Sequence, residues 1–389
     1  MKVRVKKRRA CFWSFVPNVW LVMSLGVAFG QTADELSERG TRRGGQWPLW
    51  GYDTSNTRNA AHEHIITKAN VGTLKAKWVF TTARDVSATP TVDSQAIYFP
   101  DWGGYIYKLD KDTGNLIWRH QVSEFTGMTQ PPPDGYVNFS LSRNGPALAD
   151  NLVIFGDQAS ANVMAVDKKA GNLVWKTLVE SHPSAVITSS PVVYNDVVYV
   201  GVSSLEELLA DLPGYTATFR GSVVALDVNT GNILWQTYTV PPNSGMPPYY
   251  TGGAVWGSTP AVDPKRNSLY VATGNNYTVP TSAAYCVLGG GGISCLDPSD
   301  YFDSVLALDL STGVIKWSQR VWAPDIWNGN SSLIAAQIST SAQHRISSGR
   351  RPLRGRRISS APARNRASTG RSIPTRALSS GTVLSDRAV

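Results

Sequence analysis

Two adjacent carboxylates follow a strand-like stretch near the middle of the chain. The segment VYVGVSSLEELL, Val198–Leu209, begins with β-branched residues that are typical of a strand and then places Glu206 beside Glu207. A carboxylate just past the end of a strand can belong to a binding site. Both glutamates could instead stand in solvent on one helical turn over Leu205–Leu212. The elements that position the pair must decide between these interpretations.

A four-fold internal repeat supplies those elements. Each copy is an alternating strand, an Asp, a turn closed by Gly, and a second strand that carries a Trp four residues after the Gly. Glycine suits the turn because it adopts a positive φ without steric cost. The copies are YIYKLDKDTGNLIWRH (Tyr105–His120), NVMAVDKKAGNLVWKT (Asn162–Thr177), SVVALDVNTGNILWQT (Ser222–Thr237) and SVLALDLSTGVIKWSQ (Ser304–Gln319).

The repeat predicts an all-β fold. A further strand pair precedes each copy, so each repeat is a four-stranded sheet of the size of a propeller blade. The turn glycines are Gly114, Gly171, Gly231 and Gly313, and the tryptophans Trp118, Trp175, Trp235 and Trp317 have the spacing of a docking residue between neighbouring sheets. Trp78 indicates the closing strand of one further blade. Glu206 then follows the inner part of the third blade, where the loops of a propeller build its binding site.

At this point the sequence resembles the quinoprotein alcohol dehydrogenases, which use pyrroloquinoline quinone (PQQ), and among them the polyvinyl-alcohol-dehydrogenase-like branch. The resemblance covers roughly residues 47–330 and implies an eight-bladed propeller, of which about four to five blades are present. One motif is TSSPVVYNDVVYVGVSSLEE, which matches the family's T-x-x-P opening and G-x-S-x-x-E. It implies that Thr188 and Ser203 bind the quinone and that Glu206 binds calcium.

Two further motifs extend the implied site. SRNGPAL matches the family's R-G pair and implies that Arg143 contacts the quinone, as a guanidinium suits carboxylates. VWGSTPAVDPKRNSLYVATGNN matches the family's W-G followed by G-N, which implies that Trp256 lies under the quinone ring and that Asn275 binds calcium. Each of the three also has an ordinary interpretation, as a surface base, a packing indole and a turn residue.

The chain departs from the family pattern at three places. GYVNFSLSR lacks the adjacent cysteines that many members have there, and Ala254 stands where the family has a Thr. The family's D-x-W-D appears as DIWN, so that Asn328 occupies the position of the catalytic base, and an amide cannot take a proton from an alcohol at neutral pH. Asp325 is the nearest carboxylate and is the candidate replacement.

The resemblance implies quinone-dependent oxidation of an alcohol. A hydride would pass to PQQ with calcium as the Lewis acid, and the substrate would be a small or polymeric alcohol. The electrons would leave to an acceptor such as a cytochrome. The alternative is a non-catalytic propeller that serves as a scaffold for protein–protein interaction outside the cytoplasm.

Charge and targeting signals point to an exported protein that does not bind nucleic acid. The net charge is +9, but six bases lie in the first ten residues and eleven Arg with one Asp lie in residues 331–389. Residues 31–330 therefore hold 20 bases and 27 acids, a net charge of −7, which disfavours a surface that binds nucleic acid.

Residues 1–30 combine a basic start with an apolar run, which predicts a signal peptide and a secreted or periplasmic protein. An uncleaved anchor helix is the alternative, and no integral membrane segment is expected after cleavage.

The cysteines and the last residues complete the sequence-based predictions. Cys286 and Cys295 lie nine residues apart in a Gly-rich loop and are expected to form a disulfide outside the cytosol. Residues 331–389 are rich in Arg and Ser, lack Lys and aromatic residues, and abandon the repeat, which predicts a disordered tail, possibly frame-shifted. Residues 31–330 are thus expected to form only part of the eight-bladed quinoprotein propeller. The 389-residue product is therefore expected to lack enzymatic activity.

Overall fold

The computed structural model describes residues 45–128, 140–210, 212–257 and 259–321 of the 389-residue chain. The signal segment 1–30 and the tail 331–389 lie outside the described residues. Asp325 and Asn328 lie outside them as well, so the prediction of a replacement base stays a prediction.

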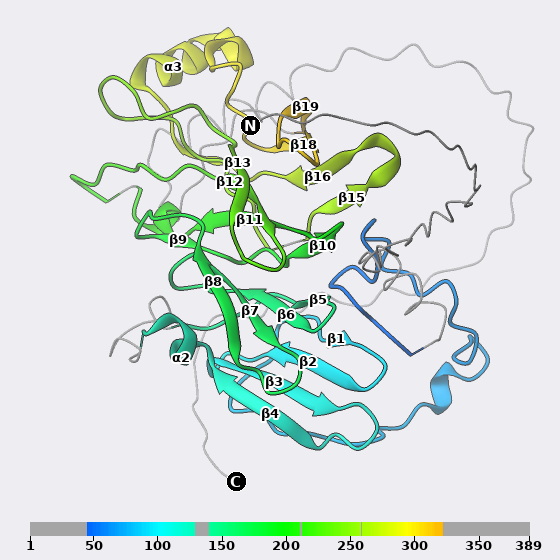
Figure 1. Ribbon diagram of the computed structural model, residues 1–389. Coiled ribbons are helices and arrows are strands. Elements are labelled where there is room, and N and C mark those ends of the chain that lie inside the picture. Colours follow the sequence, from blue (N-terminus) through cyan, green and yellow to red (C-terminus); the bar gives the residue numbers. More distant parts are fainter. Residues whose placement is uncertain (1–44, 129–139, 211, 258, 322–389) are drawn as a thin grey trace, which may run out of the picture. The chain divides into compact units, whose positions relative to one another are not determined.

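Four antiparallel sheets of four strands each make up the described fold, and their strands are neighbours in chain order within each sheet (Figure 1). Sheet A consists of β1 (Thr91–Val92), β2 (Ala96–Pro100), β3 (Tyr105–Asp110) and β4 (Leu116–Gln121). Sheet B consists of β5 (Ala147–Ala149), β6 (Leu152–Gly156), β7 (Asn162–Asp167) and β8 (Leu173–Leu178). Sheet C consists of β10 (Val192–Tyr194), β11 (Val197–Ser204), β12 (Ser222–Asp227) and β13 (Ile233–Tyr238). Sheet D consists of β15 (Ala261–Asp263), β16 (Ser268–Ala272), β18 (Ser304–Asp309) and β19 (Ile315–Arg320).

The remaining elements are short and lie between the strands. Two-residue β9 (Ala185–Val186) pairs with the end of β11, and β14 (Thr251–Gly252) pairs with β17 (Asn276–Thr278). The helices are η1 (Val71–Thr73), α2 (Val122–Thr126), η2 (Glu206–Leu208), η3 (Pro264–Arg266), α3 (Thr281–Cys286), η4 (Val287–Gly291) and η5 (Gly292–Cys295). The prediction of an all-β fold with one four-stranded sheet for each repeat is confirmed.

Each repeat turn is held by its Asp and its Gly. In sheet A, Asp110 accepts the backbone N–H of Thr113 at 2.7 Å through Oδ1, and its carbonyl accepts the N–H of Gly114 at 2.9 Å. All four turn glycines have φ between 70° and 78°. Glycine is therefore required by the backbone of the turn and not only by its surroundings.

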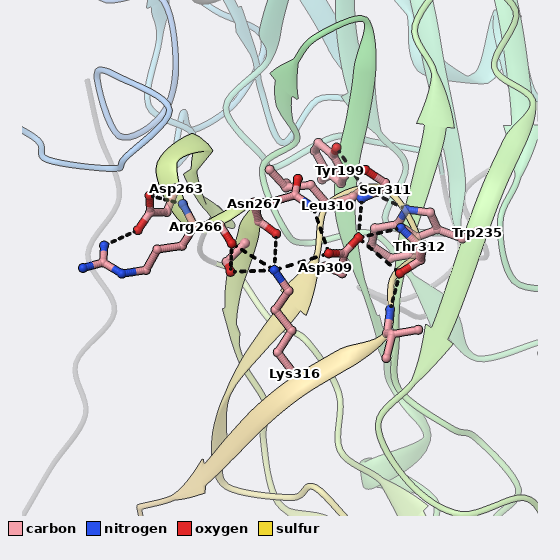
Figure 2. A network of polar contacts seen from close by, with 12 residues as sticks. Tyr199, Trp235, Asp263, Arg266, Asn267, Asp309, Leu310, Ser311, Thr312 and Lys316 are labelled. Atoms are coloured by element: carbon pink, nitrogen blue, oxygen red, sulfur yellow. Dashed lines mark hydrogen bonds and ion pairs between the residues drawn. The ribbon is translucent and has the colours of Figure 1, made fainter.

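Three of the four docking tryptophans join one sheet to the turn of the next. Trp118 of β4 donates from Nε1 to the carbonyl of Lys168 at 3.1 Å, and Trp175 of β8 donates to Val228 at 2.8 Å. Figure 2 shows the same arrangement in sheet D, where Leu310 accepts from Trp235 at 3.1 Å. A Cβ on the turn glycine would lie within 3.0 Å of the indole in each case. The glycine thus provides both the turn and the surface on which the tryptophan packs.

The turn that receives Trp235 is further fixed by charge (Figure 2). Asp309 accepts the backbone N–H groups of Ser311 and Thr312 at 3.0 and 3.1 Å. Lys316 lies 3.3 Å from the other carboxylate oxygen of Asp309 and also donates to the carbonyl of Asn267 at 2.8 Å. The contacts of Asp309 and Lys316 therefore hold this turn together independently of the Trp235 that packs on it.

The first and last tryptophans of this series differ in what covers them. Trp78 donates to the carbonyl of Lys111 at 3.0 Å and packs against Gly114, as the other docking tryptophans do on their turns, but residues 74–90 form no strand, so the predicted closing strand at Trp78 is wrong while its docking contact exists. Trp317 of β19 is 47% exposed, whereas Trp118 is 7% exposed. Within the described residues, no turn of a following sheet covers Trp317.

Candidate functional site

Strand β11 extends beyond the sheet to which it belongs. It pairs with β12 from Val197 to Val202, and its last two residues, Ser203 and Ser204, pair with β9 instead. The one-turn helix η2 starts directly afterwards at Glu206. Ser203 and Glu206 therefore lie beyond the part of β11 that pairs with β12, next to loops from other parts of the chain.

Gly201 allows one of these loops to approach. A Cβ on Gly201 would lie 2.2 Å from Cγ1 of Val255, and the N–H of Val255 donates to the carbonyl of Val202 at 3.1 Å. Trp256 follows directly and is half-buried. Its indole packs on Gly274, where a Cβ would lie 3.1 Å from both Cδ1 and Nε1. Because Gly201 and Gly274 have no side chain, the loop that carries the partly exposed indole of Trp256 can lie close to the end of β11.

The hydroxyl groups of Thr188 and Ser203 are in direct contact. Their oxygens lie 2.8 Å apart, and Ser203 also donates to the carbonyl of Val186 at 3.2 Å. Both side chains are almost completely buried. The pair joins the end of β11 to the segment that follows β9, as the motif T-x-x-P with G-x-S-x-x-E requires.

Arg143 lies on the backbone segment beside Thr188. Its neighbour Asn144 donates to the carbonyl of Ile187 at 3.2 Å, and the N–H of Gly145 donates to Ser190 at 2.9 Å. Arg143 itself is half-buried, and this burial lowers the pKa of its guanidinium. Among the described residues, no carboxylate or carbonyl contacts this guanidinium. A cation held in this way is suited to an anionic ligand.

Glu206 is fully buried and receives three hydrogen bonds. Oε1 accepts from Tyr215 Oη at 3.0 Å and from the N–H of Thr218 at 2.9 Å, and His182 Nε2 lies 3.2 Å from it, while Oε2 accepts only the N–H of Phe219 at 2.7 Å. Burial alone would raise the pKa of Glu206, but the hydrogen bonds outweigh it and lower the pKa. The carboxylate is therefore ionised at neutral pH.

Glu207 differs from Glu206 in its burial and in the direction in which its pKa is shifted. It is half-buried, and burial raises the pKa of its carboxyl group. The expected short helical turn exists as η2, over Glu206–Leu208. The interpretation that both glutamates stand in solvent is wrong, however, because the side chain of Glu206 is fully buried between the η2 turn and the segment at Phe219.

Asn275 is linked to Glu206 through a pair of aromatic rings. Its carbonyl accepts the N–H of Gly253 at 2.9 Å, which ties it to the segment that carries Trp256. Two residues later Tyr277 stacks on Phe219 with ring centroids 6.3 Å apart. In the described part of the chain, no three His, Cys, Asp or Glu side chains gather as a metal site. A cation here would therefore need amide and cofactor oxygens besides Glu206.

Three residues near these loops carried no sequence signal. His182 and Tyr215 contact Glu206 but belong to no motif. Asp300 is completely buried and accepts from Asn276 Nδ2 at 2.8 Å, and burial raises its pKa to about 7. Only the packing of distant segments reveals them.

The loop that follows β17 is closed by a disulfide. Cys286 and Cys295 are bonded, with their Cα atoms 5.6 Å apart, so this prediction is confirmed. Val279 and Leu296 at the two ends of the loop pack together with Phe302. None of the helices in the described residues has the length and apolar character needed to cross a membrane.

Comparison with known proteins agrees with this architecture. Residues 47–337 match the family described as PQQ: glucose/ethanol/alcohol dehydrogenase, beta-propeller domain. The polyvinylalcohol dehydrogenase of Sphingopyxis sp. (strain 113P3) is 31% identical over 290 residues, which are 72% of this chain and 40% of that protein. The lanthanide-dependent methanol dehydrogenase of Methylacidiphilum fumariolicum (strain SolV) is 25% identical over 362 residues, 84% of this chain and 54% of that protein.

A solved structure shows the same fold. The crystal structure of the quinohemoprotein alcohol dehydrogenase from Comamonas testosteroni matches with a TM-score of 0.58 and 25% identity, over 76% of this chain and 44% of that one. The four described sheets are therefore successive blades of a β-propeller. The chain spans between about 40% and about half of the length of these relatives.

Proposed function

Because the chain belongs to the PQQ β-propeller family of glucose, ethanol and alcohol dehydrogenases, we propose that it contributes the cofactor-binding blades of a quinone-dependent alcohol dehydrogenase. The proposed quinone site consists of Arg143, Thr188, Ser203 and Trp256. The proposed cation site uses Glu206 and Asn275. Bound quinone would supply the acceptor for a hydride from the alcohol, with calcium or a lanthanide as the Lewis acid.

The observation that carries this proposal is the half-buried guanidinium of Arg143, which meets no anion within the described residues. PQQ bears carboxylates and quinone oxygens that such a group can bind in a bidentate manner. The hydroxyl pair of Thr188 and Ser203 lies on the adjoining segment. Trp256 is half-buried and rests on Gly274, so it offers one ring face to a planar ligand.

The residues of the cation site fit a hard ion in charge and ligand type. Glu206 is ionised and buried, and its Oε2 accepts one hydrogen bond where a carboxylate oxygen has room for two. Asn275 adds an amide oxygen, the second ligand type that calcium prefers. The name of the lanthanide-dependent relative makes a trivalent ion the alternative to calcium.

The finer features follow from the relatives' names and stay part of the proposal. The substrate would be a small alcohol or a polymeric one, as for the polyvinylalcohol dehydrogenase. The electron acceptor would be a cytochrome-like protein, because several relatives are quinohemoproteins. We infer a secreted or periplasmic location from the basic and apolar start of the sequence. The scaffold alternative requires no buried, ionised Glu206.

A binding titration tests the proposal. The purified protein is titrated with PQQ in the presence of calcium, and the absorbance of the quinone is followed. Replacement Arg143→Gln should weaken PQQ binding by about tenfold or more, because a hydrogen bond to a charged group contributes about 1.5–3 kcal/mol.

Arg119→Gln is the matched control. Arg119 is an arginine of β4 in sheet A, away from the candidate site, with its guanidinium 5.0 Å from the centroid of the Tyr105 ring. We expect its PQQ affinity to equal that of the parent. Absence of PQQ binding by the parent, or equal affinities for Arg143→Gln and the parent, would contradict the proposal.

A further inference from the structure

His182 is fixed between the backbone and Glu206. It lies in the loop between β8 and β9, and its Nδ1 accepts the N–H of Ser184 at 3.1 Å. Its Nε2 lies 3.2 Å from Glu206 Oε1 and 3.1 Å from Thr218 Oγ1. The ring also packs edge-on against Phe219, with centroids 5.6 Å apart. The imidazole therefore has both a polar and an aromatic contact at the candidate cation site.

These contacts determine what the imidazole can do. A nitrogen that accepts an N–H cannot carry the proton, so in the neutral ring the proton is on Nε2, which faces both Thr218 Oγ1 at 3.1 Å and Glu206 Oε1 at 3.2 Å. Neither nitrogen then has a lone pair to offer to a metal. His182 therefore offers an N–H to Thr218 and to the adjacent Glu206 and is not a cation ligand.

The donors are distributed unevenly over the two carboxylate oxygens. Oε1 accepts from Tyr215 and Thr218, which fills its two lone pairs, and has His182 Nε2 3.2 Å away, while Oε2 accepts only from Phe219. All free acceptor capacity is thus on Oε2. The carboxylate cannot rotate to exchange its oxygens without breaking the bonds on the Oε1 side.

We propose that His182 is a positioning residue, which fixes the Glu206 carboxylate so that Oε2 is presented to the cation. The inference rests on the proposed function, because it assigns His182 a role toward the cation of that site. The backbone N–H groups of Thr218 and Phe219 hold the two oxygens from one segment, and His182 holds Oε1 from another. Partners of this kind set the orientation of a metal ligand, and their loss weakens metal binding by about 10–100-fold.

Two substitutions separate the hydrogen bond from the ring packing. His182→Phe keeps an aromatic ring against Phe219 but removes the donor, whereas His182→Gln keeps a donor and removes the ring. The apparent Kd for calcium is measured by isothermal titration calorimetry on the intact protein with saturating PQQ. We expect about tenfold weaker calcium binding for His182→Phe and a value within about threefold of the parent for His182→Gln.

A second histidine–glutamate pair provides the control. His120 Nδ1 lies 3.1 Å from Glu124 Oε2, and its ring also has aromatic neighbours, Trp118 and Phe125. This pair belongs to the β4–α2 junction of sheet A. His120→Phe should leave the calcium Kd unchanged, because its partner Glu124 is exposed and lies outside the candidate site.

The possible outcomes are distinguishable. If the parent binds calcium and His182→Phe binds it equally well, the positioning role is overturned while the proposed function stands. Weak binding by His182→Gln together with normal binding by His182→Phe would show a packing role and would also overturn it. Equal weakening of both, with a lower melting temperature in the absence of calcium, would show a general structural role. If the parent binds no calcium or lanthanide, the cation part of the proposed function falls, and the role of His182 falls with it.

Discussion

The loop after the second strand differs between sheet B and sheet C, although both sheets share the same repeat. In sheet B the strand ends at Gly156 and is followed directly by Asp157. Asp157 accepts the N–H groups of Leu141 and Ala159 at 3.2 and 3.1 Å and the hydroxyl of Ser160. In sheet C the strand continues to Ser204, and the buried acid is Glu206. Asp157 thus binds its own turn and the segment at Leu141, whereas Glu206 binds residues of the segment from Tyr215 to Phe219 and lies against His182.

The two acids also differ in charge state. Both are fully buried, yet burial raises the pKa of Asp157 in spite of its hydrogen bonds, while the hydrogen bonds of Glu206 outweigh burial and lower its pKa. Glu206 accepts from two backbone N–H groups and from the hydroxyl of Tyr215, and His182 Nε2 lies 3.2 Å from Oε1. The comparison teaches that the same repeat can use an acid to close a turn or to maintain a buried negative charge.

The largest effect is expected where β11 meets the loop of Trp256. In Gly201→Val the first added atom would lie 2.2 Å from the side chain of Val255 and 3.0 Å from its carbonyl oxygen. The loop would have to move, and we expect the free energy of unfolding to fall by about 3 kcal/mol, measured by urea denaturation. The control Gly72→Ala, which has open space around it, should change it by less than about 0.5 kcal/mol.

Equal stabilities for Gly201→Val and the parent would contradict this prediction. They would mean that the end of β11 does not support the Trp256 loop, and that the extended strand does not distinguish sheet C from sheet B.

The next effect sharpens the contrast between the two acids. Glu206→Gln should reduce the free energy of unfolding by about 2 kcal/mol at pH 7, because an amide has one acceptor oxygen where the carboxylate accepts three hydrogen bonds with two oxygens. The pKa of Glu206 is lowered from 4.5, so its contribution is present above pH 4.5 and is lost as the pH falls through the lower folded value. The difference between the parent and Glu206→Gln should therefore shrink below pH 4.5.

Asp157→Asn should show the opposite dependence on pH. The pKa of Asp157 is raised from 3.8, so the folded state keeps its proton longer, and the parent loses stability relative to the variant as the pH rises through this interval. Urea denaturation of both variants and the parent between pH 3.5 and 7, at spacings of about half a unit, measures the two slopes. Slopes of the same sign for the two variants would contradict the distinction between the acids.

The smallest effect is expected at Gly274, on which the indole of Trp256 packs. In Gly274→Ala the added methyl group would lie 3.1 Å from two atoms of Trp256, so the ring must shift by a few tenths of an ångström. We expect PQQ affinity to fall by about fivefold and the free energy of unfolding to change by less than about 1 kcal/mol. A variant with unchanged PQQ affinity would show that the position of Trp256 on Gly274 does not matter for binding.

Much of the fold could be predicted from local sequence because the repeat is locally encoded. The Asp and Gly of each turn, and the Trp four residues later, satisfy the turn and the docking contact by the same short pattern in every sheet. The disulfide between Cys286 and Cys295 is local in the same sense. The seven site residues came from motifs, and six of them lie in the described part of the chain, while Asp325 does not.

Tertiary structure alone decided the environment of these side chains. Whether Glu206 is exposed could not be read from SSLEELL, because its partners His182, Tyr215 and Phe219 lie up to 24 residues away and become neighbours only when β9 and β12 pair with β11. The approach of Val255 to Gly201 is likewise a contact between strand β11 and a loop more than 50 residues further along the chain. Turn conformation depends on a few adjacent dihedral angles, which the local sequence restricts, whereas burial and charge state depend on every group that surrounds an atom, and only the packed chain brings those groups together.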